Sequence, residues 1–343
     1  MNKNRPITYI ILLFLTTLLM VGCKGKDNNK EVVTWRFGHE ETPGSIQDQY
    51  ASKFKELVEK ESHGRIKVEI YRYGEIGEMV DYLEFTEGGL LDFCILNPGT
   101  TGTTIPENNV FYNHFLMPED TEDLKKYLKE SEGIKKLNKL NEEKNLYVLD
   151  WFCEGFNAWT ADKNIQEPDD FKGVKIRTMP SPLIVSSYKA YGANPTPVSY
   201  SEVYSGLQLK QIDAQVNPIF SIEEMKFYEV QDYLIQAKQD AFFASLNTSP
   251  EFYKSLDSDT KKMLKKVVNY MHDYIIDKQE VINQERLDKI KSVSDIEVVE
   301  LTEEQREKFR QASLPVRKEF LKSVGSEGKE ILETIEKETE KYR

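Results

Sequence analysis

The sequence predicts an α/β protein with a mainly parallel sheet, and three observations support this prediction. Apolar runs with strand spacing alternate with stretches of helical spacing between residues 32 and 152, which is typical of βαβ units with helices on both faces of a sheet. From residue 258 onward, helical spacing continues without a breaker for about 35 residues, or roughly 50 Å of helix. A chain of 343 residues is also long enough to form two domains.

The first half of the chain contains four predicted strands, at residues 32–37, 66–70, 90–96 and 146–152. Each is an apolar or alternating run bounded by polar or glycine residues. Helical spacing predicts helices around residues 50–58, over 79–85 and over 122–143. The first of these ends at Gly64 and the second at the pair Gly88-Gly89, because glycine favours helix termination.

Residues 173–218 carry the strongest functional signal. A short strand at 174–177 ends with Arg177, a helix opens at Ser181-Pro182 and closes at Gly192, a second helix begins at Ser201, and a further strand ends at Asn217. In open α/β sheets ligands bind at the carboxyl ends of strands. We therefore expect Arg177 and Asn217 to face one crevice.

Composition excludes several classes of function. The net charge is −12 and no basic run offsets it, which argues against a nucleic-acid partner. The sequence contains no nucleotide-binding, serine-hydrolase or zinc-protease motif. Its four histidines (His39, His63, His114 and His272) have no metal-ligand spacing, and we interpret them as surface or capping residues. We expect no cofactor, no metal and no enzymatic activity.

The N-terminus has the pattern of an export signal. Lys3 and Arg5 precede an apolar segment at residues 10–21, and Gly22 and Cys23 follow it. The segment resembles the lipobox of bacterial lipoproteins, which predicts a signal peptide over 1–22, a lipid on Cys23, a polar tether over 23–30 and an extracytoplasmic, membrane-anchored protein. The alternative is a plain secretory signal with a coincidental cysteine. Cys94 and Cys153 remain, in apolar runs, and we interpret them as buried free thiols.

Four ordered motifs indicate a family. They are K-I-R at 175–177, G-A-N-P-T-P at 192–197, Y-S-E-V-Y at 200–204 and D-A-Q-V-N-P at 213–218. The chain resembles the extracytoplasmic substrate-binding proteins of tripartite ATP-independent periplasmic (TRAP) transporters. This resemblance implies a two-lobe, periplasmic-binding-protein-like fold with crossing hinge strands and a long lobe-spanning helix. It implies lobe I at 31–154 plus 243–282 and lobe II at 155–242 plus 283–343.

The resemblance also implies roles for individual residues. Arg177 matches the arginine that holds the substrate carboxylate, a task that suits the fixed donor geometry of a guanidinium. The alternative is a strand arginine paired with a surface acid. Asn217 matches an asparagine thought to brace the ligand or the arginine, but without the motif it is a turn residue. Tyr200 stands where an aromatic side chain is usual, and a core tyrosine is the alternative.

Asn157 departs from the family pattern. Many members carry a second ligand-binding arginine there, whereas this chain has an amide after Glu154 and Gly155. An amide both donates and accepts. We therefore expect a monocarboxylate with a neutral polar group, such as hydroxyl, keto or amide, in preference to a dicarboxylate.

In the first lobe, the family places a ligand-facing side chain after Gly38, where this chain has His39 and then Glu40. Glu40 is the better candidate, and Asn97 occupies the matching position on the next strand. Solvent-exposed loop residues are the alternative for both. A carboxylate at Glu40 favours a sugar acid, hydroxy acid or amino-acid-like ligand, because it can accept hydrogen bonds from the hydroxyl or ammonium group of such a ligand.

The sequence therefore predicts a lipid-anchored solute-binding protein that captures a small organic acid and delivers it to the membrane permease subunits of a TRAP transporter. A binding protein for an ATP-driven importer is one alternative. Another is a ligand-sensing protein that reports to a membrane signalling receptor.

Overall fold

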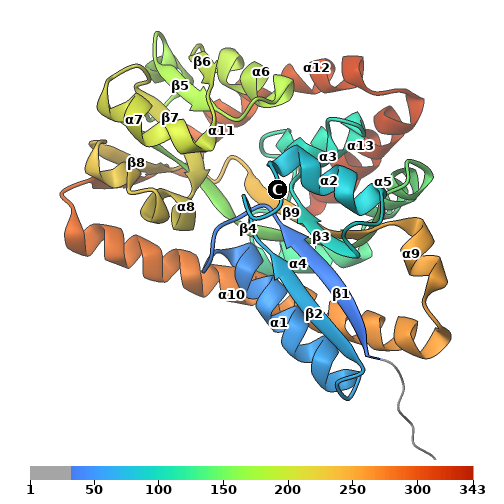
Figure 1. Ribbon diagram of the computed structural model, residues 1–343. Coiled ribbons are helices and arrows are strands. Elements are labelled where there is room, and N and C mark those ends of the chain that lie inside the picture. Colours follow the sequence, from blue (N-terminus) through green and yellow to red (C-terminus); the bar gives the residue numbers. More distant parts are fainter. Residues whose placement is uncertain (1–31, 343) are drawn as a thin grey trace, which may run out of the picture. The chain divides into compact units, whose positions relative to one another are not determined.

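The computed structural model describes residues 32–342 (Figure 1). Eight strands of this part follow one another across a mixed sheet in the order β2-β1-β3-β9-β4-β7-β5-β6, while β8 pairs with β4 and β10 pairs with β8. The strands are β1 Val33–His39, β2 Ile66–Tyr71, β3 Phe93–Leu96, β4 Tyr147–Ala161, β5 Lys175–Thr178, β6 Asn194–Pro197, β7 Ala214–Pro218, β8 Tyr233–Gln236, β9 Ala241–Thr248 and β10 Glu297–Glu300.

The prediction of a mainly parallel sheet holds at the two ends of the sheet and is wrong at its centre. Strands β1, β2 and β3 are parallel where they pair with one another, and so are β5, β6 and β7. The pairs that join these groups through β4 and β9 are antiparallel. A strand that crosses between two halves and one that returns must run in opposite directions, and an alternating sequence pattern does not reveal that.

Strand β4 links the two halves of the sheet. It is 15 residues long, much longer than the predicted strand at 146–152. It pairs with β9 as far as Phe156, and from Asn157 onward it pairs with β7. Between these partners the register shifts after Cys153, and Gly155 has a φ of +130°, which a residue with a Cβ rarely adopts. The glycine therefore permits the bend at which β4 changes partners.

The long helix α10, Ser258–Val293, is 36 residues long and confirms the prediction of a helix of about 35 residues from residue 258. Figure 1 shows it running beneath both groups of strands. It packs on α1 (Ile46–Glu61) and β4 and on α8 (Ile219–Glu224). The same helix therefore contacts elements from both predicted lobes, as expected for a two-lobe fold; the exact lobe boundaries remain a prediction.

The helix predicted over 122–143 is two helices, α4 Thr121–Glu130 and α5 Glu132–Glu143. Ser131 between them has an extended backbone and caps α5 by accepting from the Ile134 amide. Its hydroxyl donates at 2.5 Å to Glu338 of α13, Ser326–Thr339. The prediction of one continuous helix was wrong because Ser131 can serve as a helix cap and a distant segment stabilises the break.

The remaining helices cover the sheet and connect its halves. They are α2 Met79–Glu87, α3 Pro98–Thr101, α6 Pro182–Ala190, α7 Val203–Gln208, α9 Pro250–Ser255, α11 Glu303–Ser313 and α12 Val316–Ser323, with short 3₁₀ turns that include η1 Pro106–Tyr112 and η3 Tyr200–Glu202. Helix α13 packs on α5, and α12 packs on α6 and η1. The C-terminal helices therefore contact elements of both predicted lobes.

Two cysteine predictions can be compared with the structure. Cys94 and Cys153 are buried free thiols, as expected. Cys23, the predicted signal peptide and the tether lie outside the described residues. Over residues 32–342, every helix is too short or too polar to cross a membrane.

Candidate ligand-binding site

Arg177 on β5 is a buried cation without an anionic partner. Its side chain is 2% exposed, its Nε donates to the Val198 carbonyl at 2.9 Å, and its Nη1 is buried without a hydrogen-bond partner. Among the residues that the structure describes, it forms no ion pair. Burial lowers the pKa of Arg177 to about 10. Because a buried charge is costly unless it is paired, this guanidinium is suited to receive an anion.

Tyr200 lies beside that guanidinium. The Arg177 Cζ is 6.0 Å from the centre of the Tyr200 ring, at the limit of a cation–π contact. The Tyr200 hydroxyl is 2.5 Å from the Ser221 Oγ, and burial raises the pKa of the phenol above its ordinary value. The ring therefore forms an apolar wall next to Arg177, and its hydroxyl is bonded to Ser221.

Asn217, at the end of β7, and Asn157, on β4, line the same cavity. The backbones meet because Asn217 pairs with Ala158 in the antiparallel register. The Asn217 amide donates to Gln215 Oε1 at 2.5 Å. The volume that the centre of a water molecule can occupy in this cavity is about 20 Å³. This is enough for roughly one or two waters. An organic solute needs more space, so we expect these walls to separate when a ligand enters.

Asn157 is not a free polar group. Its Nδ2 donates to Asp240 Oδ2 at 3.0 Å, and its backbone N–H donates to the Asp240 carbonyl at 3.0 Å. No motif pointed to Asp240, because this residue stands in a loop before β9 that carries no sequence pattern. Asn157 is the neutral amide that the sequence predicts at this position, but its NH₂ group already donates to Asp240.

Glu40 and Asn97 are buried and bonded to each other, at the ends of β1 and β3. Glu40 Oε2 accepts from the Asn97 backbone at 2.8 Å and from its Nδ2 at 2.6 Å, and Thr100 donates its hydroxyl to the other carboxylate oxygen. Asn97 also caps α3. Burial raises the pKa of Glu40 to about 8, although these hydrogen bonds oppose the rise. The interpretation of both as solvent-exposed loop residues is therefore excluded.

Sequence reasoning missed two further acids, Glu41 and Glu154. Their carboxyl groups are close enough to shift each other's pKa, Glu154 Oε1 accepts from Gln47 at 2.9 Å, and Glu154 Oε2 is buried. Burial raises the pKa of Glu41 to about 7 and that of Glu154 well above its usual range, with Glu41 as a second cause. In the sequence, the adjacent acids Glu40 and Glu41 after β1 were the signal that could have revealed this group of acids.

A supporting ion network fixes the loop after β1. His39 Nε2 lies 3.4 Å from Asp48 Oδ1, and Arg72 Nε donates to the same oxygen at 2.8 Å. The expectation that the four histidines are surface or capping residues was wrong for three of them, because His39, His114 and His272 are each at most 3% exposed. Hydrogen bonds to buried partners make this burial possible, and sequence spacing does not show them.

The residues around Arg177 and those that follow β1 lie on two sides of one junction. Burial raises the pKa of the Tyr200 phenol, and Glu224 and Glu41 nearby add to the rise; the Thr42 hydroxyl donates to Glu224 of α8. One side of this junction therefore carries the unpaired Arg177 with an aromatic wall. The other side carries the buried carboxyl groups of Glu40 and Glu154 and the half-buried one of Glu41. Such an arrangement can bind a small molecule with an anionic group at one end and a hydrogen-bond-donating or cationic group at the other.

Comparison with known families identifies the fold. Residues 37–323 match the family described as bacterial extracellular solute-binding protein, family 7. The chain belongs to this family. The match spans both groups of strands and all the site residues described above.

The family's members include relatives with named ligands. The chain is 38% identical over 301 residues to the ectoine-binding periplasmic protein TeaA of Halomonas elongata, covering 87% of this chain and 88% of that protein. It is 36% identical over 304 residues to the ectoine/5-hydroxyectoine-binding periplasmic protein UehA of Ruegeria pomeroyi, covering 88% and 89%. The solved structure of the Halomonas elongata protein superposes with a TM-score of 0.83 at 36% identity, over 89% of this chain and 98% of that one.

These similarities confirm the predicted TRAP substrate-binding family and its two-lobe fold. The protein is an extracytoplasmic solute-binding protein of a TRAP transport system, and its partners are a small ligand and membrane permease subunits.

Proposed function

We propose that this protein captures a compact zwitterionic monocarboxylate, with ectoine as the leading candidate, and releases it chemically unchanged to a TRAP permease driven by an ion gradient. The observation that carries this proposal is the opposition of an unpaired buried guanidinium and a cluster of buried carboxyl groups. A ligand with one charge of each sign satisfies both.

Arg177 is the proposed carboxylate receptor. Its Nη1 is buried without a partner, and a ligand carboxylate accepts well-oriented bonds from a guanidinium. Tyr200 lies beside the guanidinium, and Tyr200 and Asn217 are proposed to complete that end of the site. A ligand without an anionic group would leave the guanidinium desolvated and unpaired, which is unfavourable.

Glu40, Glu41 and Glu154 are proposed to receive the opposite end of the ligand, and Asn97 holds Glu40 in place. Ectoine is a cyclic amidine with one carboxylate, so it presents two N–H donors and a delocalised positive charge. Ectoine is the named ligand of two relatives, and it meets the expectation of a single carboxylate with an amino-acid-like character. An acidic wall repels a second carboxylate, and this discriminates against dicarboxylates.

We further propose that the mature protein begins at Cys23, which carries lipid and anchors the protein on the extracytoplasmic side of the membrane. The support is the basic, apolar and cysteine pattern of residues 1–23. Mass spectrometry of the native N-terminus tests it: an acylated Cys23 is expected, and Cys23→Ser should accumulate as precursor or as a protein without lipid. A mature chain that begins elsewhere without acyl mass contradicts the anchor.

Calorimetry on the purified mature protein tests the ligand. We expect ectoine and 5-hydroxyectoine to bind more tightly than succinate and L-malate, and more tightly than lactate, which has the carboxylate but no cationic group. Lactate is the informative control, because it separates recognition by Arg177 alone from recognition by both walls. A dicarboxylate that binds more tightly than every monocarboxylate in this panel contradicts the proposal.

A further inference from the structure

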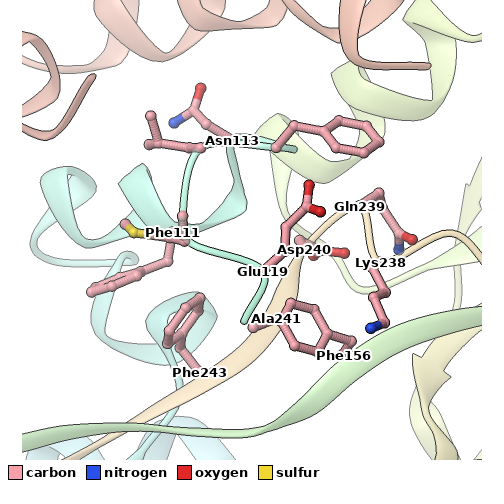
Figure 2. Close-up of a pocket in the computed structure, with 12 residues that line it drawn as sticks. Phe111, Asn113, Glu119, Phe156, Lys238, Gln239, Asp240, Ala241 and Phe243 are labelled. Atoms are coloured by element: carbon pink, nitrogen blue, oxygen red, sulfur yellow. The ribbon is translucent and has the colours of Figure 1, made fainter. Parts of the chain in front are cut away.

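Asp240 is a buried acid at the edge of the candidate site whose role the proposed function leaves open. It precedes β9 and lines the same cavity as Asn157 and Asn217. Figure 2 shows it beside Gln239, at a second cavity bordered by Phe111, Phe156 and Phe243. Asp240 therefore lies between the polar end of the site and an apolar region.

The hydrogen bonds of Asp240 orient Asn157. The Asp240 carboxylate oxygen Oδ2 accepts from Asn157 Nδ2 at 3.0 Å, and the Asp240 backbone carbonyl accepts from the Asn157 backbone N–H at 3.0 Å. An ionised carboxylate only accepts hydrogen bonds, so the amide must turn its NH₂ group toward Asp240. The Asn157 carbonyl oxygen then remains as the group that this side chain can present to a ligand.

The second carboxylate oxygen strengthens this asymmetry. Asp240 Oδ1 is buried and has no hydrogen-bond partner; within residues 32–342 the carboxylate also forms no ion pair. Burial raises the pKa of Asp240 to about 7, and the hydrogen bond from Asn157 opposes the rise. Above that pH this end of the site offers acceptors, namely Asp240 Oδ1 and the Asn157 carbonyl oxygen.

We infer that Asp240 is a specificity-determining residue that makes the Asn157 end of the site selective for N–H or O–H groups and against a second carboxylate. The inference rests on the proposed function, since it concerns which ligand end group that site accepts. It has a consequence for residue 157 itself. An arginine introduced there would meet the Asp240 carboxylate first and be neutralised by it, so the single exchange would not create a dicarboxylate site.

A double-mutant cycle tests this inference with succinate as the probe, measured by calorimetry at pH 8, where the Asp240 carboxylate is ionised. Asn157→Arg alone should leave succinate binding as weak as in the unmodified protein. Asp240→Asn alone should improve it only slightly. The combined variant should bind succinate about tenfold more tightly than either single variant, because residues in direct contact commonly show coupling of this size.

Asp232→Asn is the matched control. It removes the same charge from an exposed position near β8, so combining it with Asn157→Arg should give no coupling. Thermal unfolding confirms that each variant is folded. The inference is overturned if Asn157→Arg alone improves succinate binding as much as the double variant, or if the folded double variant shows no gain.

The cycle is independent of the ligand proposal. If the unmodified protein binds no monocarboxylate more tightly than succinate, the proposed function fails. The role of Asp240 is judged separately, from the differences in succinate affinity among the unmodified protein, the two single variants and the double variant.

Discussion

Two groups of buried ionisable side chains in this protein differ in one respect, which is whether a cation and an anion of the group pair with each other. Beneath the sheet, His272 of α10 lies with Nδ1 2.6 Å from Asp150 Oδ1 and Nε2 3.0 Å from the Lys125 carbonyl. At the candidate site, Arg177 Nη1 and Glu154 Oε2 are buried with no partner. The first group ties α10 to β4 and α4. The second leaves a guanidinium without a counter-ion and a carboxyl oxygen without a hydrogen-bond partner in a protein that binds a solute.

This difference separates stability from function. Buried charges are retained where they are paired, since a lone one costs several kcal/mol. When a binding protein keeps unpaired buried groups of both signs near each other, the missing partner is best explained as the ligand. Variants of the two groups should therefore change different properties: stability for the His272 group and affinity for the Arg177 and Glu154 group.

The largest effect should come from His272→Ala. Both ring nitrogens face acceptors, so the ring is held as an imidazolium; burial alone would lower the pKa of His272, but Asp150 raises it overall. Removing the ring leaves Asp150 buried without its cation, which costs about 3–5 kcal/mol of unfolding free energy. Urea unfolding measures this. The affinity of the remaining folded protein for ectoine should change little, and a large loss of affinity would break the comparison.

Arg177→Ala should have the opposite profile. Losing one member of a buried charge pair costs about 2–5 kcal/mol of binding, equivalent to roughly 30-fold to several thousand-fold in affinity. Stability without ligand should stay equal or rise, because a desolvated unpaired charge is removed. Calorimetry and thermal unfolding of the same sample give both values. Wild-type affinity in folded Arg177→Ala would refute the carboxylate receptor.

Glu154→Gln should sharpen the comparison on the acidic side. Glutamine cannot ionise, so the exchange removes the repulsion between residue 154 and Glu41 that adds to burial in raising the Glu154 pKa, and the unliganded protein should gain about 1 kcal/mol of stability at high pH. Ectoine should bind about tenfold more weakly, a loss of roughly 1.4 kcal/mol, because one acceptor of the cationic end is weakened. Glu143→Gln, at the exposed end of α5, is the control. A Glu154→Gln protein that binds ectoine as tightly as the wild type argues against an acidic receptor.

The smallest effect should be a pH linkage. In the unliganded protein the pKa of Glu40 is raised from 4.5 to about 8 and that of Glu41 to about 7, so between these values and 4.5 the folded state binds more protons than the unfolded one. Its stability should therefore fall as pH rises through this window. A cationic ligand lowers these pKa values, so its binding releases protons and tightens with rising pH.

Calorimetry at pH 6 in two buffers of different ionisation enthalpy measures the protons released on binding ectoine. We expect a net release, with a smaller one in Glu154→Gln. Proton uptake, or affinity that weakens between pH 6 and pH 8, would contradict an acidic wall that receives a positive charge.

Much of the architecture was predictable because its signals are local. Strand alternation placed β1, β2 and β3 within a few residues, and uninterrupted helical spacing predicted α10. The break at Ser131 was not predicted, because Glu338 stabilises it from more than 200 residues away in the chain. The antiparallel centre of the sheet was missed for a related reason: spacing within a strand says nothing about the direction of its neighbour.

The sequence by itself determined the family, the placement of Arg177 at a strand end and the loss of a second arginine at Asn157, since ordered motifs and side-chain identity are local properties. Only the tertiary structure decided which groups have partners. It buried Glu154 next to Glu41, left Arg177 Nη1 without an acceptor, and brought Asp240 against Asn157, 83 residues apart. These are contacts between distant segments under strong desolvation, and the order of residues along the chain does not encode them in any local pattern.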